Sequence, residues 1–143
     1  MTSAPRPLEG VRVVEFSHMV MGPTCGLILA DLGADVVKVE PASGGDNTRY
    51  LPGSGSGIFG TYNRNKRSVS VNLKSPEGLE FASRLVRESD VLIENFSAGV
   101  LERLGLGYEA MQKANPRLVY CALKGFLSGP YEQRVALDEV VQM

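Results

Sequence analysis

Apolar residues in this sequence fall into short runs that are separated by segments with helical spacing. Val11 to Phe16 and Asp35 to Glu40 are the first two runs, and Ser68 to Leu73 is a third in which apolar and polar residues alternate. Asp90 to Phe96 and Arg117 to Leu123 complete the set. Short runs rich in β-branched residues are typical of buried strands. The pattern therefore predicts five strands.

The segments between these runs carry helix signals. Thr24 to Ala34 places apolar residues on one face, with Thr24 as a candidate N-cap and Gly33 as a C-terminal stop. A second helix is expected after Ser75, which would be its N-cap, with Pro76 in the first helical position. The apolar face of this second helix is expected to consist of Leu79, Phe81, Ala82, Leu85 and Val86.

Two short helices, 99–105 and 107–116, are expected before the last strand. Apolar strands that alternate with helices indicate the α/β class, a Rossmann-like parallel sheet with helices on both faces. In such sheets ligands bind at the carboxyl ends of the strands. The segments that follow each strand are therefore the candidate site, including the long polar loop 41–57, because a loop of that length in a compact domain is usually functional or disordered.

Composition narrows the functional classes. A length of 143 residues with 43% hydrophobic content fits one globular domain. The balance of 15 basic and 16 acidic residues argues against a general nucleic-acid or membrane-surface binder. The N-terminal ten residues have no apolar signal core, and no apolar run reaches the roughly 20 residues of a membrane span. We therefore expect a cytoplasmic protein.

The two cysteines and the histidine are too few for a zinc site. Cys25 and Cys121 lie far apart in apolar segments, and no paired-cysteine motif is present. We expect two reduced, buried thiols and no bound metal.

The first strand-to-helix turn, "SHMVMGPTCG", contains Gly22 and Gly26 with Pro23 between them. Dinucleotide-binding folds place G-x-G-x-x-G here, so the spacing weighs against a nicotinamide or flavin site, although Glu40 ends the second strand where a ribose-binding acid would sit. His18 in this turn is either a general base or a hydrogen-bonded contact residue.

Basic residues gather around the third strand, in the stretch "NRNKRSVSVNLKSPEG". Arg64, Lys66 and Arg67 precede the strand, and Lys74 follows it at the start of a predicted helix. One interpretation is a phosphate site, because these side chains and a helix N-terminus both attract anions. The structural alternative is a solvated loop that protects the sheet edge.

The fourth strand ends in a further polar group. Asn95 and Phe96 follow it directly, and Arg103 lies on a short helix eight residues after Asn95. An amide, an aromatic ring and an arginine can together hold a nucleotide-like group. A helix cap with a surface ion pair between Arg103 and Glu102 is the structural alternative.

Seven segments of the chain, taken in order, resemble one known family. They are "GVRVVEFSHMVMGP", "LADLGADVVKVEP", "GDNTR", "NRNKRSVSVNLKSPEG", "DVLIENFSAGVLERLGLGYE", "NPRLVYCALKGF" and "GPYEQRVALDEVVQ". The set is similar to the N-terminal part of the class III CoA-transferases, the group that includes formyl-CoA transferase, carnitine CoA-transferases and α-methylacyl-CoA racemases. The resemblance runs from Leu8 to Met143.

The resemblance implies that residues 1–143 are the CoA-binding, Rossmann-like front portion of a longer chain that forms an interlocked homodimer. The incomplete helix pattern of "LDEVVQM" also suggests a cut chain. The substrates would be an acyl-CoA and a carboxylic acid, with coenzyme A as the anion, no metal, and no nucleic acid or membrane partner. The implied CoA contacts are His18, Val20, Met21, Val71, Asn72, Leu73, Lys74, Asn95, Phe96, Ser97 and Arg103.

The family transfers CoA through an aspartate that forms covalent intermediates with the acyl and CoA groups. The resemblance implies that this nucleophile lies beyond Met143, so the 143 residues alone would be inactive. Asp138 instead matches an acidic position at a helix start, and we interpret it as a cap or a neighbour of the CoA site.

Three positions depart from family patterns. Val20 stands where formyl-CoA transferase has a glutamine, which favours an acyl group larger than formate or oxalate, such as a dicarboxylic or branched acid. Pro41 replaces an arginine that contacts adenine, and Leu137 replaces the catalytic histidine of the racemases. A racemase-like enzyme and a nucleotide-binding module without catalysis remain the alternatives.

Overall fold

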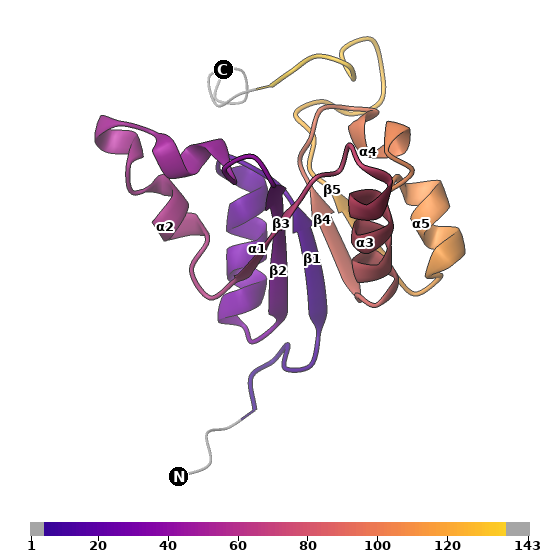
Figure 1. Cartoon of the computed structure of the whole chain (residues 1–143), viewed down its shortest axis with the longest axis horizontal. Coiled ribbons are helices and arrows are strands. Elements are labelled where there is room, and N and C mark those ends of the chain that lie inside the picture. The colour runs from indigo at the N-terminus through magenta and orange to yellow at the C-terminus, as the bar shows by residue number, and fades with distance from the viewer. Residues whose placement is uncertain (1–4, 137–143) are drawn as a thin grey trace.

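Five parallel strands form one sheet in a computed structural model of the chain, which describes residues 5–136 (Figure 1). The sheet order is β3-β2-β1-β4-β5, and each neighbouring pair is parallel. All five predicted strands are therefore confirmed. Their bounds are β1 (Arg12–Phe16), β2 (Asp35–Pro41), β3 (Arg67–Val71), β4 (Val91–Glu94) and β5 (Val119–Ala122).

Helices cover both faces of the sheet, as the pattern predicts. On one face, α1 (Met21–Asp31) packs Ala30 against Val13, Val36 and Ile93. On the other, α3 (Pro76–Arg87) and α5 (Tyr108–Ala114) pack against the strands (Figure 1). The core of this second face includes Val14, Phe16, Val39, Ala82, Val86, Leu92 and Met111. The remaining short elements are η1 (Asn47–Tyr50), η2 (Gly53–Gly55), α2 (Ile58–Tyr62) and α4 (Val100–Arg103).

Helix α1 begins earlier than predicted. It starts at Met21 rather than after Thr24, and the Thr24 hydroxyl donates to the Val20 carbonyl at 2.7 Å inside the first turn. The predicted cap is therefore wrong. The predicted stop is confirmed, because Gly33 follows the helix with φ of +107°, a conformation that favours glycine.

Helix α3 begins as predicted. The Ser75 hydroxyl accepts the backbone N–H of Gly78 at 3.1 Å, and Pro76 opens the helix. A Cβ at Gly78 would lie 2.0 Å from the Asn72 carbonyl, so the tight passage from β3 into α3 requires glycine there. Ala82 and Val86 are buried as predicted, whereas Phe81 is 43% exposed and lies off the buried face, which corrects that prediction.

Three strands are shorter than predicted. β3 ends at Val71 rather than Leu73, because Asn72 turns the chain by accepting the Lys74 N–H at 3.0 Å. β4 and β5 span 91–94 and 119–122 rather than the predicted 90–96 and 117–123. The 41–57 loop is organised by η1 and η2 instead of being irregular throughout. The helix predicted around Asp138, and Leu137 before it, lie outside the described residues.

Candidate functional site

Two adjoining cavities open at the carboxyl ends of the strands. The larger has a volume of about 640 Å³ and the smaller about 270 Å³. Both are lined by Val39, Glu40, Pro41 and Phe96, so they share a wall. Ligands of open parallel sheets bind at this edge. The larger cavity is completed by Ala42, Ser43, Val71, Asn72, Leu73 and Lys74, and the smaller by Ser17, His18, Met19, Asp46 and Asn47.

The tip of β3 supplies the polar rim of the larger cavity. Asn72 and Lys74 are exposed there, and Leu73 is half-buried against the core. Helix α3 begins at Pro76, two residues after Lys74, so the partial positive charge of its N-terminus lies close to the lysine. This rim therefore combines a flexible cation with a helix terminus, an arrangement that suits a phosphate group.

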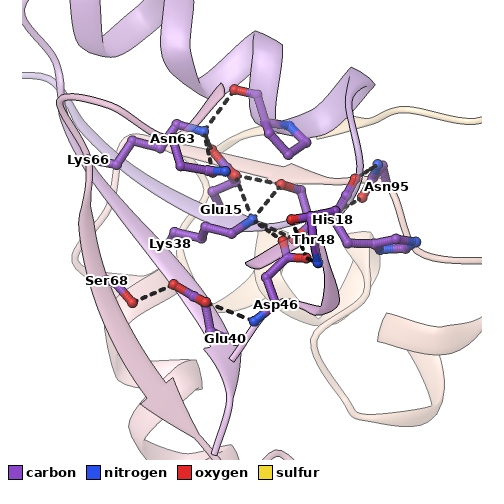
Figure 2. Close-up of polar contacts among 12 residues, drawn as sticks. Glu15, His18, Lys38, Glu40, Asp46, Thr48, Asn63, Lys66, Ser68 and Asn95 are labelled. Carbon is purple, nitrogen blue, oxygen red and sulfur yellow. Dashed lines mark hydrogen bonds and ion pairs between the residues drawn. The ribbon is translucent and has the colours of Figure 1, made fainter. Parts of the chain in front are cut away.

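The tips of β1 and β4 are joined side by side. The Asn95 side chain accepts the His18 N–H at 3.0 Å and donates to the His18 carbonyl at 2.8 Å (Figure 2). The His18 and Phe96 rings lie 5.7 Å apart, centroid to centroid. Met19 adopts φ of +62°, a strained conformation for a residue with a side chain. The amide of Asn95 thus fixes a strained turn at the wall of the smaller cavity.

The pKa of His18 lies below its ordinary value. Desolvation lowers the pKa, the charge of Asp46 opposes this effect, and the charge of Lys38 adds to it. The imidazole is therefore neutral near pH 7, and a neutral imidazole can accept a proton or a hydrogen bond from a ligand.

A buried charge network supports this turn from beneath. The Lys38 ammonium donates to the Ser17 carbonyl at 2.7 Å and lies 3.3 Å from a Glu15 oxygen and 3.0 Å from an Asp46 oxygen (Figure 2). Lys66 contacts the other Glu15 oxygen at 2.8 Å. All four charged side chains are buried. The network ties β1, β2 and the following loops together below the smaller cavity.

The two glycines of the first turn make room for these contacts. A Cβ at Gly26 would lie 1.8 Å from a Glu15 carboxylate oxygen, and one at Gly22 would lie 2.5 Å from the Ser17 Cβ. Gly22 and Gly26 therefore allow α1 to approach the sheet closely. Close packing of α1 on the sheet thus accounts for both glycines without a dinucleotide ligand.

Glu40 is engaged by protein groups. Its carboxylate accepts from Arg49 at 2.7 Å for each oxygen, from Ser68 at 2.6 Å and from the Asp46 N–H at 2.8 Å. Burial alone would raise the pKa of Glu40, but these donors outweigh it and lower the pKa to about 2. The carboxylate thus anchors the loop that follows β2, and its engagement argues against the ribose-binding role.

The three basic residues at the N-terminal end of β3 are paired with acids. Arg64 contacts Asp31 at 2.5 Å, and Arg67 pairs with Asp35 at the start of β2, the opposite end of the sheet from the cavities. Lys66 is buried against Glu15. None of the three lines either cavity. The structure therefore argues against a phosphate site at these three residues. Arg64 and Arg67 are solvent-exposed, as in the structural alternative, whereas Lys66 is buried instead of solvated. Lys74 is the basic residue on the wall of the larger cavity.

The structure gathers about half of the predicted contact residues. Val71, Asn72, Leu73 and Lys74 share the larger cavity with Phe96, and His18 shares the smaller one with the same ring. Asn95 holds the His18 backbone instead of facing either cavity. Among the described residues, the walls do not include Val20, Met21, Ser97 or Arg103.

Sequence reasoning placed the loop after β2 at the candidate site but assigned none of its residues as contacts. Pro41 at the end of β2 and Ala42, Ser43, Asp46 and Asn47 of the loop all line a cavity. The signal was the length of that loop, but its composition does not tell which of its residues face the site.

The remaining predictions on chemistry concern cysteines, metals and membranes. Cys25 and Cys121 are free but only half-buried, and burial raises the pKa of the Cys25 thiol. Within residues 5–136, no cluster of three or more histidine, cysteine or acidic side chains is arranged to hold a metal. None of the helices in that range has the length and apolar character needed to cross a bilayer.

Comparison with known proteins identifies the family. The family model of CoA-transferase family III matches residues 8–143. The chain belongs to this family. The formyl-CoA:oxalate CoA-transferase of Rhodopseudomonas palustris is 45% identical over 96% of this chain and 33% of the relative. The succinate–glutarate CoA-transferase of Agrobacterium fabrum is 43% identical over 99% of this chain and 39% of the relative.

Solved structures agree with this assignment. A CaiB/BaiF family protein of Brucella suis superimposes with a TM-score of 0.89 at 42% identity, over 97% of this chain and 39% of that one. A protein of Mycobacterium tuberculosis gives a TM-score of 0.87 at 38% identity, over 93% of this chain and 38% of that one. The chain thus spans between a third and two fifths of the length of the relatives it matches.

Proposed function

We propose that this chain is the CoA-binding portion of an enzyme that moves CoA from an acyl-CoA donor to a carboxylic acid acceptor. The observation that carries the proposal is the larger cavity, in which the Asn72-to-Lys74 turn of β3 faces Phe96 of the β4 tip. It supplies a cation and a helix N-terminus for phosphate, and apolar walls for the adenosine and pantetheine groups. The chain's family supports this ligand over other nucleotides.

In this proposal Lys74 binds a phosphate of CoA, and Phe96 contacts the pantetheine arm where the two cavities adjoin. The thioester would then reach the smaller cavity, where His18 is neutral and its backbone is fixed by Asn95. A neutral imidazole there can orient the acyl group by hydrogen bonding.

The covalent chemistry belongs to an aspartate that we place beyond Met143. Its carboxylate attacks the acyl-CoA carbonyl and expels the CoA thiolate, which leaves a mixed anhydride. The thiolate then attacks the aspartyl carbonyl and releases the donor acid, forming an aspartyl-CoA thioester. The acceptor carboxylate attacks the aspartyl-CoA thioester and expels the CoA thiolate, which leaves a second mixed anhydride. The thiolate then attacks the acyl carbonyl of this anhydride, which releases the aspartate and forms the new acyl-CoA. Each carbonyl attack develops an oxyanion that backbone N–H groups must stabilise.

We further propose that the acids that this enzyme exchanges, including the acceptor, are larger than formate or oxalate. Val20 offers no polar group where formyl-CoA transferase has a glutamine, and the exposed Met21 follows it at the start of α1. Curated relatives that act on oxalate and on glutarate match this chain about equally well, so their names do not decide the acid. Turnover of the longer enzyme with succinate and with oxalate as acceptors, compared by kcat/KM, tests this point, and a preference for oxalate would contradict it.

Calorimetric titration of the chain with CoA, dephospho-CoA and NAD tests the binding proposal. We expect CoA to bind more tightly than NAD, and Lys74→Ala to weaken CoA binding by about tenfold, the effect of losing one charge-assisted phosphate contact. The matched control is Lys113→Ala, which removes an exposed lysine of α5 and should leave binding unchanged.

Equal affinity for NAD and CoA, or no effect of Lys74→Ala, would contradict the assignment. We also expect the 143 residues alone to give no CoA transfer with any pair of acids. Steady turnover by this chain would overturn the placement of the nucleophile beyond Met143.

A further inference from the structure

Two charged side chains, Glu94 and Lys124, form hydrogen bonds with the main-chain N–H and C=O of Phe96. The Glu94 carboxylate accepts the backbone N–H of Phe96 at 2.9 Å. The Lys124 ammonium donates to the carbonyl of the same residue at 2.7 Å. Lys124 and Glu94 also contact each other, at 2.5 and 2.7 Å for the two carboxylate oxygens. The three groups form a closed set of contacts.

Because the Glu94 side chain is buried, the contacts among Glu94, Lys124 and the Phe96 main chain depend on the positive charge of Lys124. The Glu94 side chain is only 3% exposed, and Lys124 is 30% exposed. A buried carboxylate is strongly unfavourable without a paired charge, because desolvation is not repaid by neutral contacts alone. Lys124 therefore supplies the paired charge for the buried Glu94 carboxylate, and Glu94 in turn accepts the backbone N–H of Phe96.

Sheet topology explains how these residues meet. Glu94 ends β4 and is in register with Ala122 of β5, and Lys124 follows β5 by two residues. The lysine thus reaches back over the tip of the neighbouring strand. Phe96 lines both cavities, and its ring lies against His18. A shift of its main chain would change the shared wall of both cavities.

We propose that Glu94 and Lys124 act as a clamp that positions Phe96, and that Lys124 is a positioning residue for CoA binding. The role of Lys124 in CoA binding rests on the proposed function, whereas the positioning of Phe96 does not. The clamp contacts the peptide groups of Phe96 and lets its ring face the ligand, so the clamp acts through Phe96 without needing to touch CoA.

The single histidine of the chain gives a direct measurement. Its ring-proton NMR signals at pH 8, where the imidazole is neutral, report the ring current of Phe96 without ambiguous assignment. We expect Lys124→Met to shift these signals, and Lys124→Arg, which keeps a donor cation, to restore them. We expect CoA affinity to fall by about tenfold in Lys124→Met and to recover in Lys124→Arg.

Three further variants separate positioning from general loss of stability. Lys113→Met removes a distant exposed lysine, and Ser75→Ala weakens the chain by removing the cap of α3. Both should leave the His18 signals unchanged. The double variant Glu94→Gln/Lys124→Met leaves no unpaired buried charge, so it serves as the test variant if Lys124→Met alone fails to fold. It still loses the Lys124 donor to the Phe96 carbonyl. This double variant should show the same shift of the His18 signals.

Unchanged His18 signals in Lys124→Met and in the double variant would overturn the clamp. If the signals move while the unmodified chain fails to bind CoA, the clamp stands and the proposed function fails. If the signals move and CoA affinity in Lys124→Met stays the same, the role of Lys124 in CoA binding is wrong.

Discussion

Gly26→Ala is expected to destabilise the chain strongly for so small a substitution. The added Cβ would lie 1.8 Å from a Glu15 carboxylate oxygen and 3.1 Å from the Lys66 ammonium. Either α1 must move away from the sheet, or the carboxylate must rotate away from Lys66 and Lys38. Forcing extra atoms into a packed core costs about 1–3 kcal/mol, and breaking a buried ion pair costs about 3–5 kcal/mol.

The helix itself gains from this substitution. Alanine is about 1 kcal/mol better than glycine inside a helix. The steric cost and the ion-pair cost do not add fully, because a movement that relieves one of them increases the other. We therefore expect a net loss of about 3 kcal/mol in the free energy of unfolding. Urea unfolding followed by circular dichroism at 222 nm measures this difference.

Gly60→Ala is the matched control. It lies inside α2, is exposed, and has nothing within 4 Å of its added Cβ. The same chemical change should therefore be neutral or stabilise the chain by up to about 1 kcal/mol. If Gly26→Ala is as stable as Gly60→Ala, α1 does not lie as close to Glu15 as described, and the buried network is wrong.

Three other predictions follow from single contacts. Ser75→Ala removes the acceptor for the Gly78 N–H and should cost about 1 kcal/mol in urea unfolding, with no change expected if α3 is uncapped. The lowered pKa of Glu40, about 2 against an ordinary 4.5, means that its contribution to stability is complete above about pH 4.5 and is lost as the pH falls toward 2. Arg49→Met should therefore lower the free energy of unfolding at pH 7 and reduce its decrease as the pH falls from 4.5 toward 2. Urea unfolding at a series of pH values measures this, and an unaltered profile would contradict the Arg49–Glu40 ion pair. NMR titration of His18 should give a midpoint below 6.5 that rises in Phe96→Ala as water reaches the ring, and a midpoint at or above 6.5 in the unmodified chain would contradict its desolvation.

Local signals in the sequence were sufficient for the strands and for α3. β-branched runs mark strands through their own burial, and the Ser75–Pro76 pair marks a helix start through contacts within one turn. The start of α1 was mispredicted because long-range contacts set it. The turn before it is held by Asn95, 77 residues away from His18.

Charged side chains were the hardest part of the site to predict. No sequence pattern pairs Glu15 with Lys38, whereas the register of β1 with β2 places them opposite each other, where they form an ion pair. Arg64 and Arg67 look like an anion site until their pairing with Asp31 and Asp35, over 30 residues away, is known. Sequence alone gives the sign of each charge but not its partner, and the partner decides whether the charge is available to a ligand.

The family resemblance supplied what local patterns could not. Val71 to Lys74 and Phe96 were predicted as contacts from matching motifs, and the structure places them around one cavity. Arg103 was predicted in the same way, but it is exposed on α4 and lies off the walls described for residues 5–136. Its role in CoA binding remains a prediction.

We propose that the carboxyl ends of β1, β3 and β4 converge on one CoA molecule. Two-dimensional NMR of the isotope-labelled chain during titration with CoA tests it most directly. We expect saturable shifts concentrated at Asn72, Leu73, Lys74 and Phe96, with a smaller effect at His18. Shifts centred on Arg64 and Arg67 at the far end of the sheet, or no saturable shifts, would contradict it.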